Sequence, residues 1–541
     1  MSTGSPGNGA ATGNGAAGRR RTGTRTVAVV GGGIAGLAAA WELSGGAAGP
    51  AADTPRVVLL EAGPTVGGKL RSEPFAGRSV DMGPDGFLGR RPEAADLCAE
   101  VGLGDDLVPI ATSGAAVLAR GRRRSLPAGL VLGIPTRFWP TVRSGILGPR
   151  GSLRLLRDVV APRTDSRGPL GDRAIGPLVA RKLGQRVVDA LVDPLIGGIH
   201  AGGVGDMSSA AVFPLLLAVA QRRGSFMRAL RSVVPAEHVG APTATRPDVL
   251  EPAPDDGADG ASAPAGHGDA EEPPAFWALR PGICALPERL AGRLTERGVA
   301  VRTGAPVELL DQADGGWVLH TPDGPVVADG LVLAVPAPVA AELIGPHDVD
   351  AATLLGGIVW ASVAVVTFAF AADDLPSGLV GTGLLVPAGS RRHRREGHGD
   401  GHFLVTACTY LSAKWPHLSA GDEVLLRASV GRFGDERFAA LDDDALVARV
   451  HDELGELLGL TATPHTSVVV RWPESFPQYR VHHLLRVTGI ESALRRLPAV
   501  AVAGASYRGV GIPACVASGR TAAQTVMGSL SGQPTGAGPV P

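Results

Sequence analysis

The chain has 541 residues, of which 44% are hydrophobic and 19% are charged, and its formal net charge is −1. This length is enough for two or three domains with a large buried core, and the near-neutral charge gives no global indication of a nucleic-acid partner. Four well-separated cysteines, Cys98, Cys284, Cys408 and Cys515, form no C-x-x-C pair and no metal-ligand spacing. We therefore expect unpaired thiols in a reducing cytosol and no metal site.

The folded part is expected to begin with a β-α-β unit. Residues 1–25 are rich in Gly, Ala, Ser, Thr and Arg without an apolar segment, which predicts a disordered tail and not a signal peptide. The apolar run 26–31 predicts a buried strand, 34–43 a helix, and RVVLLE at 56–61 a second strand.

Glycines at the first strand–helix junction fit the pattern G-x-G-x-x-G, with Gly31, Gly33 and Gly36. The first allows a tight turn, the second lets a pyrophosphate approach the backbone, and the third lets helix and strand pack closely. Glu61 ends the next strand, where a carboxylate can accept hydrogen bonds from ribose hydroxyls. A glycine-rich structural turn is the alternative, and the position of Glu61 favours dinucleotide binding.

Two further glycine clusters indicate which dinucleotide. Gly67 and Gly68 follow the second strand. An NAD enzyme has no physical need for this doublet, whereas the pyrophosphate and ribityl chain of an extended flavin dinucleotide pass such a loop. The turn Gly83–Pro84–Asp85–Gly86 is suited to passing close beneath a flat ring.

The middle of the chain alternates between regular segments and polar insertions. Residues 107–232 have a helical texture, whereas 233–275 are mainly Pro, Ala, Gly, Asp and Glu and predict a disordered acidic insertion. Strand, turn and helix are expected over 330–344, and a solvated loop over 390–402. The uncharged stretch 351–372 is long enough to span a membrane, but its Gly-Gly break and alternating β-branched residues favour a long buried strand.

A second glycine-rich segment, AGASYRGVGIPACVASGR, occupies residues 503–520. It changes to helical character at Pro513, and proline suits the first turn of a helix because its missing N–H is not needed there. Taken alone, the segment fits a loop before a surface helix as well as it fits a ligand site. Paired with the first segment, it favours a cofactor held jointly by both ends of the chain.

These motifs together resemble the flavin-dependent oxidases that share an E-x5-G-G signature, a group that includes amine oxidases and phytoene desaturases. Within this group the chain is most similar to the porphyrinogen oxidases of haem biosynthesis. The resemblance covers nearly the whole folded chain in order, and its most specific stretches are DPLIGGIHAG at 193–202 and GVGIPACVASG at 509–519. His200 stands where the family commonly has an aromatic residue, and Ala115 or Ala116 stands where some relatives have a propionate-anchoring arginine.

The resemblance implies an α/β fold. Its parts would be a Rossmann-like FAD-binding domain of the glutathione-reductase/amine oxidase type, a substrate domain with a mixed sheet, and a helical subdomain. The implied division is a disordered tail at 1–25, FAD-binding parts at 26–106, 276–345 and 486–530, a helical substrate- and membrane-facing subdomain at 107–232, a disordered acidic insertion at 233–275, the substrate sheet at 346–485, and a disordered tail at 531–541.

The implied cofactor is FAD, with its adenosine diphosphate end at Gly31, Gly33, Gly36 and Glu61, and its adenine at the backbone of Val307. The amides of Val510, Gly511 and Ile512 would face the flavin pyrimidine edge, where a helix N-terminus stabilises negative charge on the reduced ring. The full set of expected cofactor contacts is Gly31, Gly32, Gly33, Ile34, Ala35, Gly36, Glu61, Ala62, Gly67, Gly68, Lys69, Gly83, Pro84, Asp85, Gly86, Val307, Gly504, Val510, Gly511 and Ile512.

The implied reaction is the loss of six hydrogens from a porphyrinogen in three rounds of hydride transfer from a meso carbon to flavin N5. Dioxygen would reoxidise the flavin and yield hydrogen peroxide. The sequence offers no convincing general base or nucleophile, so we assign no catalytic residue; the cofactor would supply the chemistry. Retained yellow colour after acid denaturation would instead favour an amine or carotenoid oxidase, and a non-enzymatic relative would have lost the glycine pattern.

The substrate is expected to be coproporphyrinogen III, with protoporphyrinogen IX as the alternative. Candidate substrate contacts are Gly198 and Gly202, with Gly197, because glycine lets a flat macrocycle lie against the backbone; a plain loop after a helix is the alternative. Arg120, with Arg122, Arg123 and Arg124, could bind carboxylates, but the segment fits a solvated basic loop better. His482 and His483 receive no role in the reaction. We expect a cytoplasmic protein, with membrane contact by the helical region at the inner face, and transfer of product to a downstream haem-pathway enzyme.

Overall fold

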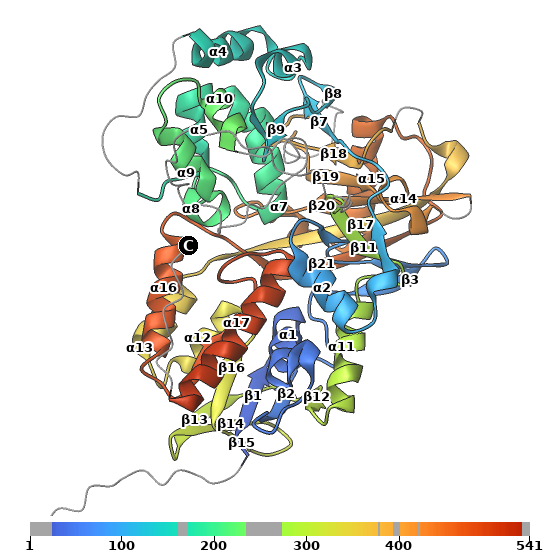
Figure 1. Ribbon diagram of the computed structural model, residues 1–541. Coiled ribbons are helices and arrows are strands. Elements are labelled where there is room, and N and C mark those ends of the chain that lie inside the picture. The colour runs from blue at the N-terminus through green and yellow to red at the C-terminus, as the bar shows by residue number, and fades with distance from the viewer. Residues whose placement is uncertain are drawn as a thin grey trace, which may run out of the picture.

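A computed structural model describes residues 24–160, 171–233, 273–376, 379–392, 401–419 and 422–532. The expected tails at 1–25 and 531–541, the acidic insertion at 233–275 and the polar stretch at 390–402 lie mostly outside these described residues. In the described part, a lower lobe contains a parallel sheet, and an upper part contains a larger mixed sheet and a cluster of helices (Figure 1).

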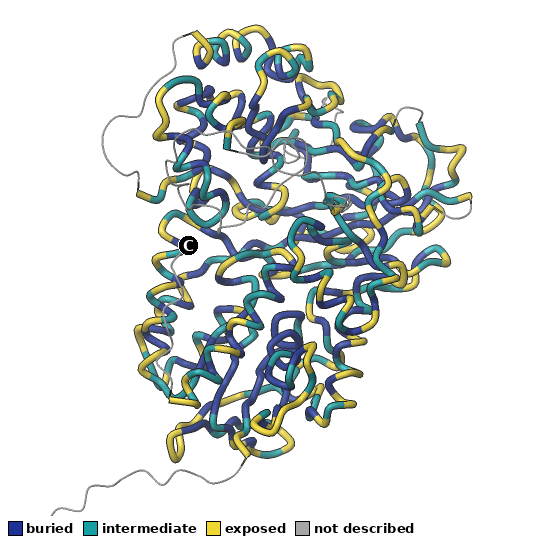
Figure 2. The backbone as a smooth tube through the Cα atoms, viewed as in Figure 1, coloured by how far each residue is buried: buried dark blue, intermediate teal, exposed yellow. Residues whose placement is uncertain are grey.

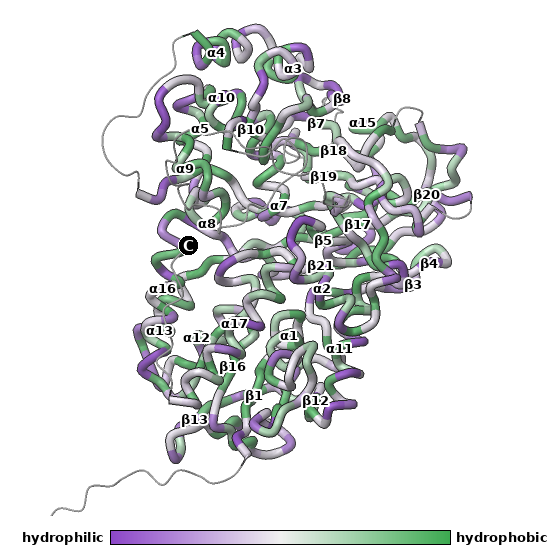
Figure 3. Tube along the Cα trace, in the orientation of Figure 1, coloured by the Kyte–Doolittle hydropathy of each residue, from purple (hydrophilic) through white to green (hydrophobic). Residues whose placement is uncertain are grey.

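The lower lobe is built on a five-stranded parallel sheet in the order β12-β2-β1-β16-β22. Apolar, β-branched residues dominate its central strands, as a sheet covered on both faces requires, and Figure 3 shows β1 and β16 as hydrophobic. The strands are β1 (Thr26–Val30), β2 (Arg56–Leu60), β12 (Ala300–Arg302), β16 (Gly330–Leu333) and β22 (Val500–Val502). The first two strands and helix α1 (Ile34–Leu43) agree with the predicted β-α-β unit to within a residue.

Alternate residues of these strands enter two different cores. Val27 and Val29 face α1, α11 (Ala285–Glu296) and α17 (Ile512–Ser531). Ala28 and Val30 belong to the core on the opposite face, which is covered by β13 (Leu309–Ala313), β14 (Gly316–His320), β15 (Val326–Ala328), α12 (Ala337–Ile344), α13 (Val349–Gly356) and α16 (His483–Leu494). The period-2 alternation of a strand thus produces a three-layer lobe. The predicted strand, turn and helix at 330–344 are confirmed as β16 and α12.

The upper sheet has seven strands in the order β21-β17-β20-β19-β18-β7-β8. Its neighbours are antiparallel except for β18 and β7, which run parallel. One face packs on α15 (Asp443–Leu458) through Ala364, Val366 and Phe368. The strands are β21 (Thr466–Pro477), β17 (Trp360–Ala371), β20 (Glu423–Val430), β19 (Val405–Tyr410), β18 (Gly383–Leu385), β7 (Ala116–Ala119) and β8 (Arg122–Ser125).

The predicted strand over 351–372 is correct in its second half and wrong in its first. Residues 349–356 form α13, whose N-terminus is capped by the Asp348 carboxylate, which accepts a 2.8 Å bond from the Ala351 N–H. The Gly356–Gly357 pair ends the helix, and the β-branched run then forms β17 from Trp360. A side-chain cap outweighed the apolar composition of the segment.

The segment expected to be helical over 107–232 begins with five short strands. Two of them, β7 and β8, form an arginine-rich hairpin that joins the seven-stranded sheet through β7. The five strands are β6 (Leu107–Pro109), β7, β8, β9 (Leu130–Val131) and β10 (Ile134–Pro135). Helices follow as α3 (Phe138–Arg143), α4 (Gly148–Val160), α5 (Ile175–Leu183), α6 (Gln185–Val187), the π-helix η3 (Val188–Gly197), α7 (Gly198–His200), α8 (Ser209–Val212), α9 (Pro214–Gln221) and α10 (Phe226–Val233).

The remaining described elements lie between those already named along the chain. They are β3 (Ser72–Phe75), β4 (Arg78–Asp81), β5 (Phe87–Leu88), β11 (Phe276–Leu279), α2 (Pro92–Glu100) and α14 (Leu411–Lys414), with short 3-10 turns η1 (Gly46–Ala48), η2 (Gly104–Asp106), η5 (Ala372–Asp374), η6 (Pro416–Leu418) and η7 (Arg437–Ala440). Buried backbone runs through both sheets (Figure 2). Within the described ranges, no helix has the length and apolar character that crossing a membrane requires.

Candidate cofactor and substrate cavity

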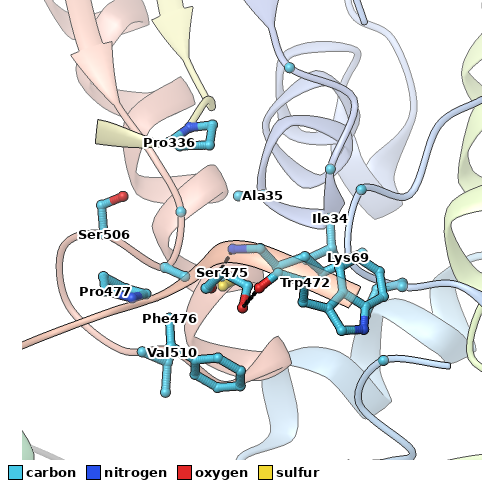
Figure 4. A pocket seen from close by; sticks show the side chains of 18 of the residues that line it. Ile34, Ala35, Lys69, Pro336, Trp472, Ser475, Phe476, Pro477, Ser506 and Val510 are labelled. Atoms are coloured by element: carbon cyan, nitrogen blue, oxygen red, sulfur yellow. Dashed lines mark hydrogen bonds between the residues drawn. The ribbon is translucent and has the colours of Figure 1, made fainter. Parts of the chain in front are cut away.

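One cavity of about 690 Å³ lies between the parallel sheet and the seven-stranded sheet. Its wall combines the β1–α1 junction, the end of β2, the start of α17 and the exposed face of β17, β20 and β21. Segments from both ends of the chain therefore line the same space. Figure 4 shows part of this cavity, with Lys69 and Trp472 among its side chains and Pro336 and Ser506 further along it.

The three glycines of the first motif serve three different purposes. Gly31 has a φ of 104°, and a Cβ there would lie 2.5 Å from the carbonyl oxygen of Ala334. A Cβ on Gly36 would collide with the carbonyl of Gly31, so this glycine lets α1 pack on its own junction. A Cβ on Gly33 would meet nothing within 4 Å and would project into open space beside the cavity. Only Gly33 leaves room for a ligand to approach the backbone.

Glu61 is fixed by backbone donors at the adjoining end of the cavity. Its Oε2 accepts from the Gly32 N–H at 2.5 Å, and its Oε1 accepts from the Gly63 N–H at 2.7 Å. The Gly67 N–H donates to the Gly32 carbonyl at 2.9 Å, so the glycine doublet docks on the first glycine loop. The two motifs that are about 30 residues apart in the sequence thus form one rigid cradle.

The second glycine-rich segment lies directly beside the first. Helix α17 crosses α1 so closely that a Cβ on Gly519 would collide with the carbonyl of Ala35. Gly511 is the N-cap of α17 and has no side-chain cap, which leaves N–H groups of the first turn for a ligand. The pairing inferred from the sequence, in which both chain ends meet at one site, is what the structure contains.

Tyr479 and His483 hold the loop that precedes α17. The Tyr479 hydroxyl accepts from the Gly509 N–H at 2.8 Å and donates to the Ala505 carbonyl at 2.6 Å. The His483 ring stacks on Tyr479 with a centroid distance of 3.9 Å, and its Nε2 lies 2.7 Å from the Tyr507 carbonyl oxygen. Burial lowers the pKa of His483 to about 4. His483 therefore acts as a neutral structural residue. His482 contributes its backbone N–H, which donates to Asp172 at 2.6 Å.

Lys69 brings a buried cation to the cavity wall. Its Nζ donates to the Ser475 carbonyl at 2.5 Å and lies 5.1 Å from the centroid of the Trp360 ring (Figure 4 draws the bond to Ser475). Burial lowers the pKa of Lys69, and the nearby Cys515 thiol acts in the opposite direction. Cys515 also lines the cavity, and burial raises its pKa to about 11, so the thiol is protonated.

Within the turn 83–86, only Gly83 and Pro84 line the cavity. Asp85 points away and binds Lys414 Nζ at 2.8 Å, Arg427 Nη2 at 3.2 Å and the Trp415 indole N–H at 3.0 Å. Burial opposes ionisation of Asp85, but the two cations outweigh it and hold its pKa below the usual range. Asp85 thus ties the turn to the seven-stranded sheet.

Most of the expected site residues line the cavity. These are Gly31, Gly33, Ile34, Ala35, Glu61, Ala62, Gly67, Gly68, Lys69, Gly83, Pro84, Val307, Gly504, Val510 and Ile512, together with Gly197 and Gly198 on the substrate side. Gly32, Gly36, Asp85, Gly86 and Gly511 adjoin the wall without being part of it, and Gly202 packs against the Gln478 side chain.

The candidate arginines lie elsewhere. Arg120 is exposed at the β7–β8 turn with a φ of 57°, and Arg122, Arg123 and Arg124 belong to β8. None of the four lines the cavity, whose described wall carries the cations Lys69, Arg427 and Arg432 instead.

The sequence reasoning also missed the sheet face opposite the glycine cradle. Its contributing side chains are Val363, Val365, Thr406, Arg427, Ser429, Trp472 and Phe476. One signal was available: in β20 the polar residues Arg427 and Ser429 alternate with the buried Leu426, Ala428 and Val430. Such alternation marks a strand with one polar face.

A parallel sheet with a glycine cradle at its strand ends, facing a second sheet across a deep cavity, defines a dinucleotide-binding protein with a separate substrate domain. Comparison with protein families places residues 34–527 in the family described as flavin containing amine oxidoreductase. The chain belongs to this family, and it is an oxidoreductase with a flavin cofactor.

Curated relatives cover almost the whole chain. A coproporphyrinogen III oxidase of Bacillus subtilis is 30% identical over 506 residues, covering 92% of this chain and 97% of the relative. A coproporphyrinogen III oxidase of Propionibacterium freudenreichii is 33% identical, covering 92% and 90%. A protoporphyrinogen oxidase of Macaca fascicularis is 31% identical, covering 93% and 99%. A solved structure from Exiguobacterium sp. 255-15 superposes with a TM-score of 0.77 at 29% identity, covering 94% of this chain and 99% of that one.

Proposed function

We propose that this chain is an FAD-dependent oxidase that converts coproporphyrinogen III to coproporphyrin III in haem b biosynthesis. The observation that carries the proposal is the single cavity in which both glycine-rich segments meet a broad sheet face. Its similarity to coproporphyrinogen III oxidases extends over more than nine-tenths of the chain. The Macaca relative makes protoporphyrinogen IX the alternative substrate.

The residues present fit FAD. The open space at Gly33 admits a pyrophosphate, and Glu61 and Val307 line the end that would receive the adenosine. The uncapped start of α17 and the Lys69 ammonium group supply positive potential where a redox ring would lie. Bound FAD would supply the redox chemistry: it would accept a hydride in each round and be reoxidised by dioxygen, which would be reduced to hydrogen peroxide. Because each round removes two hydrogens, the loss of six hydrogens takes three rounds.

The protein's own contribution is positioning and exclusion of water. Gly197, Gly198 and Ala201 leave backbone exposed to the cavity, and Val363, Val365 and Phe476 add apolar surface. A flat macrocycle can lie against such a wall without displacing side chains. Cys515 lines the cavity, and we expect the flavin to be bound without a covalent link to it.

The test is to mix the purified protein with coproporphyrinogen III or protoporphyrinogen IX in air and follow porphyrin fluorescence. We expect faster oxidation of coproporphyrinogen III, with three molecules of dioxygen consumed and three of hydrogen peroxide formed per porphyrin. Faster oxidation of protoporphyrinogen IX would make it the substrate in place of coproporphyrinogen III. Oxidation of benzylamine or putrescine but of neither porphyrinogen would overturn the proposal. Acid denaturation should release free yellow flavin.

We also propose that the protein touches the cytoplasmic face of a membrane through α3 and α4, and that it passes its product to a downstream haem-pathway enzyme. Trp139, Leu153 and Val160 are 64%, 68% and 68% exposed, and exposed arginines flank them at 137, 143, 150 and 157. Exposed apolar groups among cations suit an anionic lipid surface. Figure 2 shows this exposed end of the molecule, at the top of the view.

A further inference from the structure

The substrate side of the cavity contains a cation with donors to spare. Of the three cations in the described wall, Lys69 donates to the Ser475 carbonyl. Arg427 commits Nη1 to the carbonyls of Asp81 and Gly83, at 3.1 and 3.0 Å, and Nη2 to Asp85 at 3.2 Å. Both residues therefore serve the cofactor side and its supporting turn.

Arg432 is bound more loosely. Its Nη1 lies 3.4 Å from Asp193 Oδ2, and its Nε is buried without a hydrogen-bond partner among the described residues. The two side chains are 13% and 15% exposed, so the pair is shielded from bulk water. A guanidinium carries five N–H donors, and a single bond of 3.4 Å leaves most of them for a ligand.

The pair is held at a fixed place on the wall. Asp193 belongs to the π-helix η3, and its Oδ1 accepts from the Val204 N–H at 3.1 Å. The N–H of Phe433, next to Arg432, donates to the Ala201 carbonyl at 2.7 Å. These bonds join the helical cluster to the seven-stranded sheet beside the cavity. π-helical segments are rare and are frequently found at functional sites.

Gly197 lies against the pair. A Cβ on Gly197 would lie 2.5 Å from the Gly202 carbonyl oxygen, so the close approach of these two backbone positions requires glycine. The same Cβ would lie 3.5 Å from Arg432 Nη2 and 3.4 Å from Asp193 Oδ1, so the pair lies directly beside backbone that lines the cavity.

We infer that Arg432, which lies beside Asp193, binds a carboxylate of the macrocyclic substrate. This inference rests on the proposed function, in which the substrate carries propionate side chains. A carboxylate entering an apolar cavity must be paired, because its transfer from water is otherwise costly. Arginine is suited to this task because its planar fork matches a carboxylate with two parallel bonds. Without bound substrate, Asp193 would compensate the charge of the guanidinium.

The experiment compares binding of coproporphyrin III with binding of its tetramethyl ester, in the same non-ionic detergent, by quenching of porphyrin fluorescence. The ester has the same ring without the charges. We expect Arg432→Met to weaken binding of the acid about tenfold, or about 1.4 kcal/mol, and to change binding of the ester less than about twofold. The control is Arg480→Met, because Arg480 also pairs with an aspartate, Asp206 at 2.7 Å, but this pair is exposed and Arg480 lies outside the cavity wall.

The variant Asp193→Asn distinguishes carboxylate binding by Arg432 from a purely structural role of the Arg432–Asp193 pair. The asparagine keeps an acceptor for Val204 and removes the charge that competes for Arg432, so we expect the acid to bind at least as tightly as in the wild type. Equal losses in Arg432→Met and Asp193→Asn, or equal losses for acid and ester, would overturn the inference. If Arg432→Met fails to retain flavin, Arg432→Lys is used, with an expected smaller loss confined to the acid. A wild-type protein that oxidises neither porphyrinogen refutes the proposed function itself, whereas normal oxidation with unchanged acid binding in Arg432→Met refutes this inference alone.

Discussion

Glu61 illustrates how a single carboxylate organises the cofactor end of the cavity. It accepts two backbone N–H groups, from Gly32 and Gly63, and still faces the cavity. In Glu61→Ala the N–H groups of Gly32 and Gly63 lose their acceptor, and the hydroxyl groups of an incoming ribose lose the carboxylate that would accept their hydrogen bonds. We expect flavin affinity to fall at least about tenfold, measured as the flavin-to-protein absorbance ratio after dialysis.

The control for this change is Glu296→Ala on α11. Glu296 is 65% exposed and forms a surface pair with Arg293 at 3.1 Å, which contributes little to stability. The Glu296→Ala variant should retain flavin as the wild type does. Equal flavin content in Glu61→Ala and Glu296→Ala would show that the Glu61 carboxylate is dispensable for cofactor binding.

His483 makes the free energy of unfolding depend on pH in the acidic range. Burial lowers its pKa from 6.5 to about 4, so below pH 6.5 the unfolded chain binds a proton that the folded chain does not. Its contribution is therefore complete above pH 6.5 and is lost as the pH falls towards 4. Between pH of about 7.5 and about 5 this amounts to about 2 kcal/mol.

His483→Gln tests this assignment, because glutamine can still donate to the Tyr507 carbonyl and does not titrate. We expect a lower Tm at neutral pH and a smaller drop in Tm on acidification than in the wild type. His200, whose pKa burial also lowers to about 4, remains in both proteins and accounts for part of the residual drop. An identical drop in the two proteins would contradict the role of His483.

The crossing of α1 and α17 is the element-level feature on which the cofactor cradle depends. A Cβ on Gly519 would collide with the Ala35 carbonyl and would lie 3.0 Å from the Ala39 nitrogen. Gly519→Ala must push the helices apart, so we expect a loss of about 1–3 kcal/mol in unfolding free energy together with weaker flavin retention.

Gly292→Ala in α11 is the matched control. A Cβ there meets nothing within 4 Å, and alanine in an exposed helix should stabilise the protein by about 0.5–1 kcal/mol. The two substitutions are chemically identical and should shift the Tm in opposite directions. Equal shifts would mean that the crossing tolerates a methyl group.

At the level of elements, local signals predicted most of what positions the cofactor. The strand and helix at 26–43 and the helix at 337–344 follow directly from apolar periodicity and glycine or proline at their boundaries. The strands β6 to β10 were missed because two- to four-residue strands carry no periodic signal; their pairing is set by distant partners, as β7 is by β18. The same distance explains why Arg432 could not be identified from the sequence: only the folded sheet brings Arg432 next to Asp193.

At the scale of the whole molecule, the exposed apolar groups on α3 and α4 predict binding to anionic vesicles. The protein should sediment with phosphatidylglycerol vesicles and not with phosphatidylcholine vesicles, and added salt should release it. The double variant Trp139→Ser and Leu153→Ser should reduce sedimentation severalfold, because it removes two of the most exposed apolar side chains.

Leu485→Ser provides the control, since Leu485 is 72% exposed on α16 in the opposite lobe (Figure 1). Undiminished vesicle binding in the double variant, or an equal decrease in Leu485→Ser, would exclude α3 and α4 as the lipid-facing surface.

Because α17 packs directly on α1 but lies far from it along the chain, the ribosome releases the two halves of the cradle at different times. The α1 surface that α17 covers stays uncovered until Ile512–Ser531 have been synthesised. Nascent chains released by truncation before residue 512 should therefore copurify with chaperones and contain no flavin, whereas full-length chains should acquire it after release.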